Sequence, residues 1–228
     1  MGSARVEGPR LEAGLLPRVM AGVHLRPAVQ RRLAGVAEII ERERLWHPVA
    51  LCRILPASLE GPSGVRLDSG HVVEGDMEWL AGAREVAIVL VTLGAAWSEA
   101  VAACFRRDEP LRGYLLDDIG TTLLERLSRR LEAMARLSAH RRGLQAGSPR
   151  QPGQPGLPLS AQPLLAELAE ARSIGIEVTA TGMLAPVKSL SMIIGIGHGL
   201  PRWTQKDACL ECPAFARCDH RRSAERCQ

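Results

Sequence analysis

The sequence predicts a mixed α+β fold, and three features along the chain indicate it. Residues 86–93 form a continuous apolar run, which is typical of an inner strand. Residues 114–141 repeat Leu, Ile and Met at intervals of three and four, which predicts one long helix. Residues 174–199 alternate Thr and Ser with other residues, as strand side chains alternate between two faces. A chain of 228 residues can bury one sizeable core around these elements.

The first half of the chain predicts a lead-in followed by alternating helices and strands. Residues 1–25 are rich in Gly, Arg and Leu without a clear period, which indicates a loose lead-in. Apolar residues at near-helical spacing predict an amphipathic helix over 27–44 that begins at a proline. The elements expected next are a strand (49–55), a short hairpin (65–73), a short helix (77–83), the inner strand (86–93) and a helix (95–106).

The second half predicts two helices, a strand pair and a tail. After the long helix, residues 143–158 are rich in proline and glycine and indicate a loop. A helix over 159–172 follows. Pro186 interrupts the segment 174–199, so two strands, or a strand and a bulge, are expected there. We therefore predict a lead-in (1–25), one α+β domain (26–200) and a cysteine-rich tail (201–228).

Composition excludes some partners. The formal net charge is +4, and all but two of the basic side chains are arginines, the exceptions being Lys188 and Lys206. Because no basic stripe is interleaved with aromatic residues, we expect no nucleic-acid partner. No stretch is long and apolar enough to span a bilayer and the first residues lack an apolar targeting segment, so we expect no membrane partner and a cytoplasmic location.

The cysteine tail predicts a metal site. Its cysteines are Cys209, Cys212, Cys218 and Cys227. The first three follow the pattern C-x2-C-x5-C, and a C-x2-C pair lets two thiolates chelate one centre from a tight turn. Zinc and an iron–sulfur cluster both suit such ligands, and His220 could replace the last cysteine. Cys52 and Cys104 stand in apolar context and are expected to be buried as small hydrophobic side chains.

Small residues concentrate in the segment 174–199. Its glycines include Gly182, Gly195, Gly197 and Gly199. Glycine in or beside a strand often marks a close approach by a ligand or another backbone. The segment therefore predicts a surface against which something large lies flat, the alternative being an ordinary sheet of small residues.

These residues also carry a resemblance. The segment Thr179-x-Thr-Gly-Met-Leu-x-Pro-x-Lys-Ser-x-Ser-x-Ile-Ile-Gly-Ile-Gly resembles the late signature of the activation domain of vitamin B12-dependent methionine synthase, in its free-standing form. Three earlier segments fit in the same order: 85–94, which ends in Thr-Leu-Gly; 114–125, which contains Asp-Asp-Ile-Gly; and the proline–glycine loop 152–162. The resemblance covers about residues 27–220 and implies a twisted, mainly antiparallel sheet packed with helices on one side.

The function that the resemblance implies is reductive reactivation of a corrinoid protein. In the family, the activation domain docks over cob(II)alamin, an electron donor such as ferredoxin or flavodoxin reduces the cobalt, and S-adenosylmethionine methylates it. No corrinoid-binding Asp-x-His-x-x-Gly motif occurs in this sequence, so we expect an accessory component that acts on the cobalamin of a separate methyltransferase. An iron–sulfur cluster in the tail would then serve as an electron relay.

The resemblance also implies a set of binding residues, and no catalytic ones. They are Asp117, Glu125, Gly153, Gln154, Thr181, Gly182, Met183, Lys188, Ser189 and Ser191. Where the family's loop has an arginine and a Gly-Tyr pair, this chain has Pro149, with Arg150 one place off, and Gly153-Gln154. Glutamine cannot wall off an adenosyl group as a tyrosine ring does, so two outcomes stay open at this loop. Either S-adenosylmethionine binds in a changed pose, or its site is lost and the chain is an activator that delivers electrons without itself binding the methyl donor.

Two alternatives come from other classes of protein. A non-catalytic, zinc-clipped interaction module in a methyltransferase complex would have the same tail without affecting cobalt. A small S-adenosylmethionine-dependent methyltransferase ranks lower, because no Gly-rich loop with a later acidic residue follows the first strand.

Overall fold

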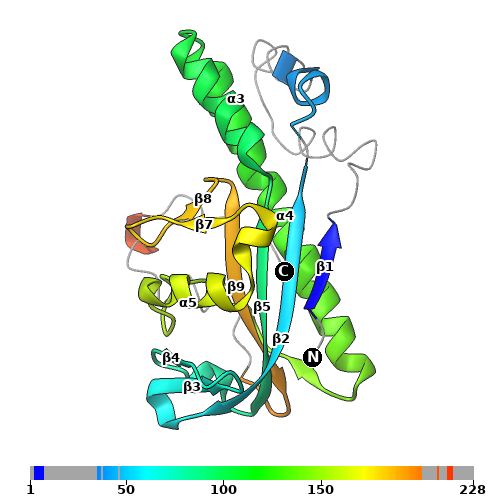
Figure 1. The fold of residues 1–228 in the computed structure, drawn as a ribbon, viewed down its shortest axis with the longest axis vertical. Coiled ribbons are helices and arrows are strands. Elements are labelled where there is room, and N and C mark those ends of the chain that lie inside the picture. The colour runs from blue at the N-terminus through cyan, green and yellow to red at the C-terminus, as the bar shows by residue number, and fades with distance from the viewer. Residues whose placement is uncertain are drawn as a thin grey trace.

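The computed structural model describes residues 3–7, 35–36, 38–45, 47–201, 210 and 215–217. Within them, seven strands form one sheet: β1 (Ser3–Glu7), β2 (Val49–Leu59), β3 (Gly64–Leu67), β4 (Val72–Glu74), β5 (Ala83–Thr92), β6 (Gln145–Ala146) and β9 (Ser189–Gly197). The strand order is β4-β3-β2-β5-β9-β6, and β1 pairs with β2 off this path. Every pairing is antiparallel, which confirms the predicted mainly antiparallel α+β fold (Figure 1).

Among the described residues, three α-helices of seven residues or more pack on the two faces of this sheet, and short 3₁₀ turns occur between the elements. The helices are α3 (Ala95–Arg106), α4 (Pro110–Arg141) and α5 (Gln162–Leu168), and residues 35–36 and 38–42 are also helical. The 3₁₀ turns are η1 (Gly61–Ser63), η2 (Glu78–Leu80), η3 (Leu159–Ala161), η4 (Ala171–Ile174) and η5 (Phe215–Arg217). α3 has the predicted bounds. α4 begins four residues before the predicted start because Pro110 opens it, a position at which proline loses no helical hydrogen bond.

Both faces of the sheet are buried, which corrects the expectation of helices on one side. Alternate residues of β5 divide between two cores. Ala87, Val89 and Val91 pack with α3, α4 and the helical residues 35–42, whereas Val86, Ile88 and Leu90 pack with α5, η2 and η4. The continuous apolar run of β5 follows from this arrangement, since neither of its faces meets water.

Several elements differ from the sequence prediction. The lead-in contains β1, which pairs with β2 from Ser3↔Arg53 to Glu7↔Val49. The proline–glycine loop contains β6, which pairs with β9. The helix expected over 159–172 is divided into η3, α5 and η4, and Glu170 at the last boundary has a left-handed backbone with φ of 58°. These elements form through contacts with residues that are distant in the sequence. The periodicity of a short segment does not report such contacts.

The segment around Pro186 forms a small hairpin followed by a strand. The hairpin pairs β7 (Glu177–Val178) with β8 (Leu184–Ala185), and β9 begins three residues after Pro186. The predicted interruption at Pro186 is therefore confirmed. The predicted strand alternation holds at Ser189 and Ser191 in β9, whereas Thr179 and Thr181 lie in the turn of the hairpin.

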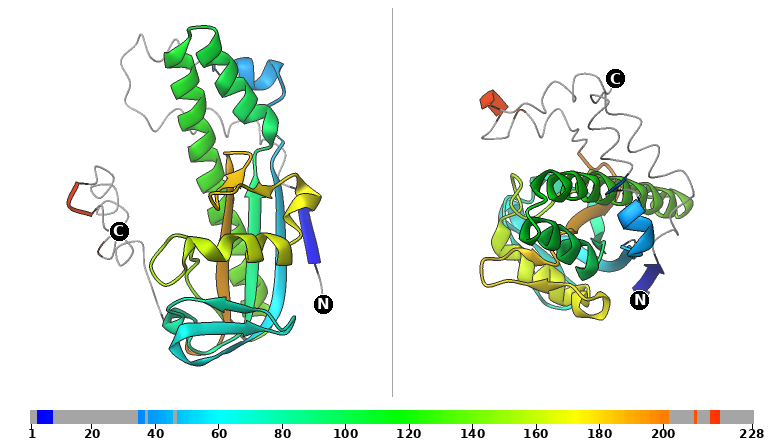
Figure 2. Two further views of the ribbon diagram at one scale, coloured as in Figure 1. Left: turned by 60° about the vertical axis from the view of Figure 1, so that its left-hand side comes forward. Right: turned by 90° about the horizontal axis from the view of Figure 1, so that it is seen from above.

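The α3–α4 hairpin extends past the end of the sheet (Figures 1 and 2). Trp97 near the start of α3 is fully buried, and its Nε1 donates a 3.1 Å hydrogen bond to the backbone oxygen of Leu116 in α4. Gly120 lies beside this ring, and a Cβ there would come within 2.4 Å of Trp97 Nε1. In the part of the chain that the structure describes, no helix is long and apolar enough to cross a membrane.

Candidate functional site

Lys188 lies just before β9 and connects the sheet to α4. Its side chain is buried, with Nζ 2.8 Å from Asp117 Oδ1. Nζ also donates a 2.8 Å hydrogen bond to Thr121 Oγ1, and that hydroxyl donates to the backbone oxygen of Asp117. An ammonium that is removed from water requires such partners, so these contacts hold the lysine in one place. Two predicted site residues, Asp117 and Lys188, are thus brought together although they are far apart in the sequence.

The hydroxyl of Thr92, the last residue of β5, organises the same end of the sheet. It donates to the Lys188 backbone oxygen at 3.4 Å and accepts hydrogen bonds from Ser189 Oγ at 2.8 Å and from the Gly94 backbone N–H at 3.0 Å. Gly94 precedes α3 with φ of 89°. The buried Thr92 hydroxyl therefore connects β5, β9 and the start of α3 through hydrogen bonds. The Ser189 hydroxyl is part of the same network.

Ser191 lies on the face of the sheet that packs against α5, and its side chain contacts that helix. Its hydroxyl donates a 3.0 Å hydrogen bond to Gln162 Oε1, and both side chains are buried. Gln162 Nε2 has no hydrogen-bond partner among the described residues. Ser191 therefore positions the first residue of α5 on the sheet, and its hydroxyl does not face solvent.

The turn between β7 and β8 is closed by threonine side chains and a glycine. The Gly182 N–H donates to the Thr179 backbone oxygen at 2.9 Å, and Gly182 has φ of 82°, which favours glycine. Thr179 Oγ1 lies 3.0 Å from Thr181 Oγ1 and accepts a 3.1 Å hydrogen bond from the Met183 N–H. The turn thus presents exposed hydroxyl groups on a defined backbone.

Exposed apolar side chains border this end of the molecule. Met183 is 59% exposed and Val187, next to the buried Lys188, is 72% exposed. Leu159 is also exposed, and its side chain lies 3.3 Å from where a Cβ on Gly182 would be. This end of the molecule thus combines exposed hydroxyl groups with exposed apolar side chains.

The proline–glycine loop turns its arginine inward. Arg150 is buried, its Nη1 donates to the Pro155 backbone oxygen, and its guanidinium carbon lies 5.2 Å from the centre of the Trp79 ring. Its backbone pairs with Ile193 of β9 through hydrogen bonds of 2.9 and 2.8 Å. The Arg150 guanidinium therefore holds the loop against the sheet.

Gln154 and Gly153 likewise form hydrogen bonds within the loop. Gln154 Oε1 accepts a 2.9 Å hydrogen bond from the Gln151 N–H, and the Gly153 N–H donates to the Leu157 oxygen at 2.8 Å. Gly153 has φ of 93°. The loop therefore presents neither an aromatic ring nor an outward arginine at the positions where the resemblance implies binding of S-adenosylmethionine.

Some predicted residues lie apart from this cluster. Glu125 is 59% exposed, and its carboxylate lies 4.0 Å from Arg129 one turn along α4. Gly195 and Gly197 lie at the far end of β9, where added Cβ atoms would come within 2.7 Å of Leu80 and 2.0 Å of the Gly82 oxygen. These two glycines permit the close approach of neighbouring protein atoms, which is one of the two interpretations that the sequence left open.

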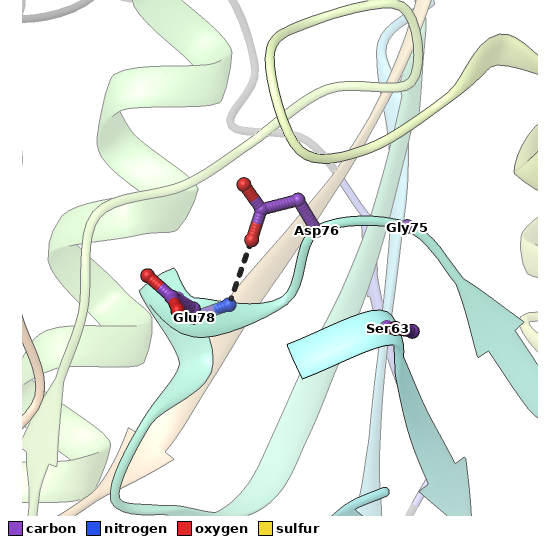
Figure 3. Close-up of a pocket in the computed structure, with 4 residues that line it drawn as sticks. All are labelled: Ser63, Gly75, Asp76 and Glu78. Carbon is purple, nitrogen blue, oxygen red and sulfur yellow. Dashed lines mark hydrogen bonds between the residues drawn. The ribbon is translucent and has the colours of Figure 1, made fainter. Parts of the chain in front are cut away.

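A shallow pocket lies at the opposite end of β5. Its volume is about 550 Å³, and it is lined by Ser63, Gly75, Asp76 and Glu78 (Figure 3). One carboxylate oxygen of Asp76 accepts a 3.4 Å hydrogen bond from the Glu78 N–H at the start of η2. β5 has ten residues, so its two ends are about 30 Å apart, and the pocket is separate from the Lys188 cluster.

The predicted tail metal site lies outside the described residues, since none of Cys209, Cys212, Cys218 and Cys227 is among them. Among those that are described, no group of three or more His, Cys, Asp and Glu side chains could hold a metal ion. Cys104 is buried, as predicted, and Cys52 is half-buried. Burial raises the pKa of the Cys52 thiol, so this side chain stays a neutral thiol.

Thr92 and Thr121 contribute to the cluster although neither was singled out by sequence reasoning. A signal exists for each. Thr92 follows a buried apolar strand, where a polar residue marks the strand end, and Thr121 lies one turn after Asp117 on the helix. What the sequence does not show is that Lys188 reaches both elements.

Neither a protein-family model nor a curated protein matches this sequence. Among solved structures, the fold is similar to that in "Crystal Structure of the MetH Reactivation Domain bound to AdoHcy", with a TM-score of 0.67. The match covers 98% of this chain and 86% of that chain, at 14% sequence identity. The chain thus has the fold of that reactivation domain over nearly its whole length.

Proposed function

We propose that this chain is an accessory reactivation component that docks over the corrinoid of a separate cobalamin-dependent methyltransferase, such as methionine synthase. The observation that carries the proposal is the shared fold with a MetH reactivation domain across 98% of the chain. The resemblance in the segment 179–197 supports it independently of the overall fold, because it falls on the hairpin turn and β9 beside the Lys188 cluster.

The corrinoid would lie against the surface formed by the β7–β8 turn and the residues before β9. Met183 and Val187 supply exposed apolar area there, and Thr181 supplies an exposed hydroxyl. Hydroxyl groups both donate and accept, which suits the amide groups at the edge of a corrin ring. Lys188 is buried and paired, so its role in this proposal is to position the segment through Asp117 and Thr121.

The reaction that we propose is a one-electron reduction of cob(II)alamin to cob(I)alamin on the partner. The electron comes from an external donor, a reduced ferredoxin or flavodoxin, which is oxidised by one electron in the same step. We further propose that the tail cysteines hold a metal centre, either an iron–sulfur cluster that relays this electron or a structural zinc ion. The C-x2-C-x5-C spacing supports a metal and does not distinguish the two.

The methyl donor is not held by Gly153 and Gln154 in this proposal. The inward Arg150, and the hydrogen bond of Gln154 to its own loop, both support this view. Titration with S-adenosylhomocysteine in a calorimeter tests it, and we expect no heat of binding from the wild-type chain. Measurable binding that Gln154→Ala abolishes would contradict the proposal and restore the loop as a binding site.

The function is tested by anaerobic purification with metal analysis, followed by mixing with the cobalamin-binding domain of a methionine synthase loaded with cob(II)alamin. Iron with a visible absorption band, and a changed cobalt spectrum in the presence of reduced flavodoxin, are the expected results. Val187→Glu should suppress the spectral change, whereas Leu137→Glu, at a comparably exposed position on α4, should not. Zinc together with an unchanged corrinoid spectrum would instead favour the non-catalytic, zinc-clipped module.

A further inference from the structure

The α3–α4 hairpin carries an exposed aromatic pair in a chain that is poor in aromatic residues. The chain has only two Phe and one Tyr, and two of these three, Phe105 and Tyr114, contact each other near the end of the hairpin. Their ring centres are 5.2 Å apart and the rings are nearly perpendicular, at 88°. With Leu111 they form a patch that we call the hairpin tip.

The hairpin tip is exposed, and its Phe105 ring packs against α4. Tyr114 is 66% exposed, Phe105 43% and Leu111 39%. The Phe105 ring lies against α4, where a Cβ on Gly113 would come within 2.8 Å of it. Edge-to-face rings on helices lose little side-chain entropy when they are covered, and aromatic residues are enriched at protein interfaces. A patch of this kind marks an interaction surface.

The hairpin tip continues the surface that includes Asp117 and Thr121. Tyr114 and Thr121 are seven residues apart on α4, which places them on one stripe of the helix about 10 Å apart. Thr121 accepts the hydrogen bond from Lys188, and Val187 is exposed beside that lysine. Exposed apolar groups therefore lie on both sides of the Lys188 cluster, on α4 and before β9.

We propose that the hairpin tip contacts the polypeptide of the corrinoid-carrying partner, beside the region in which the corrinoid faces the β7–β8 turn. The inference rests on the proposed function and adds a protein contact to it. Leu111 lies about 15 Å along α4 from Thr121, and the hairpin projects past the sheet, so the tip reaches beyond the cofactor surface (Figure 2). The partner is thus held by an apolar, aromatic contact outside its cofactor.

Charged residues stand beside the apolar patch. Arg112 forms a 2.7 Å ion pair with Glu109, while Arg106 and Arg107 directly follow Phe105 and are exposed. Substitutions of Leu111 and Tyr114 by serine change the apolar area and leave these charges in place.

The test compares the wild-type chain with Leu111→Ser/Tyr114→Ser. The first probe is the cobalamin-binding domain of methionine synthase loaded with cob(II)alamin, with affinity measured by calorimetry, and the second is free cob(II)alamin, followed by its visible spectrum. The double variant should bind the loaded domain about tenfold or more weakly, as truncation of an aromatic interface residue does, with the response to free cob(II)alamin unchanged. Tyr114→Arg is a second variant at a position that is two-thirds exposed, so folding is retained.

Met134→Ser/Leu137→Ser is the matched control. These side chains are 44% and 51% exposed on the same helix, and Met134 is twenty residues, or about 30 Å, from Tyr114. Equal binding by the tip variants and the wild type, or an equal loss in the control, overturns the inference while leaving the proposed function in place. A wild-type chain that binds neither probe overturns the proposed function itself. Dimerisation of the wild type that the tip variants abolish, with partner binding unchanged, would assign the tip to a second copy of this chain.

Discussion

Lys188 and Asp117 form an ion pair in which the two partners differ in their access to water. The lysine side chain is 9% exposed and the aspartate side chain 47%, with Nζ and Oδ1 2.8 Å apart. Water can therefore replace the lysine as a partner for the carboxylate, but it has little access to the ammonium. The two residues should respond differently to substitution.

Asp117→Ala should destabilise the protein more than Lys188→Met. The first change leaves a buried ammonium with Thr121 as its remaining partner, and we expect it to lower the free energy of unfolding by about 1–3 kcal/mol. Lys188→Met removes the buried charge and should cost less than about 1 kcal/mol. Urea unfolding of both variants measures the difference. The double variant Asp117→Ala/Lys188→Met should be more stable than Asp117→Ala, and the opposite order would show that the pair contributes through something other than charge burial.

Gly120→Ala should disturb the junction of α3 and α4. The added Cβ would lie 2.4 Å from Trp97 Nε1, which already donates to Leu116, so the ring or the helix must shift. We expect a loss of about 1–3 kcal/mol, since overpacking outweighs the higher helix propensity of alanine. Thermal unfolding followed by tryptophan fluorescence measures it.

Gly147→Ala is the control for that experiment. Its nearest neighbouring atoms would be 3.7 Å from the new Cβ, which is an ordinary contact. It should change the free energy of unfolding by less than about 0.5 kcal/mol. Equal effects of the two alanine substitutions would contradict the close packing of Gly120 on Trp97.

Arg150→Lys should loosen the proline–glycine loop. Lysine keeps the charge but loses the planar guanidinium that lies over Trp79 while donating to Pro155. We expect a stability loss of about 1–2 kcal/mol. Amide hydrogen exchange should quicken at Gly153 and Leu157, whose N–H groups close the loop. The exposed Arg172→Lys is the control and should leave exchange in this loop unchanged.

Cys52 should make the stability fall at alkaline pH. Burial raises the pKa of its thiol in the folded chain above the ordinary value of 9.0 that it has when unfolded. As the pH rises, Cys52 therefore loses its proton in the unfolded state before it does so in the folded state. Its contribution to the free energy of unfolding is complete below about pH 9 and is lost as the pH rises through the folded pKa.

Cys52→Ala tests this directly. The variant should lose less stability than the wild type between pH 8 and pH 10.5, as measured by urea unfolding, since it lacks the titrating thiol. Cys104 stays in place in both chains and serves as the internal control. If the free energy of unfolding changed with pH in the same way in both chains, the prediction would be wrong. Cys52 would then ionise equally easily in the folded and unfolded states.

Much of the fold could be predicted from the sequence because its signals are local. α3 has its predicted bounds, the 65–73 hairpin is present as β3 and β4, and all but the last residue of the run 86–93 lies within β5. The arrangement of the predicted site residues was not visible in the sequence, and their binding roles stay predictions. Asp117 and Lys188 meet as members of one cluster, but Glu125 instead pairs with Arg129, and Ser191 faces α5. The metal site at the tail cysteines stays a prediction.

The sequence by itself determined the α+β class, the long helix α4, the bounds of α3 and the inner position of β5, because apolar periodicity records which faces of each element avoid water. The tertiary structure alone decided that Lys188 reaches α4, that Arg150 turns inward onto Trp79, and that Gly195 and Gly197 accommodate neighbouring loops. Such contacts join residues distant in the chain. They depend on strand register and on how helices pack across the sheet, which no local pattern encodes.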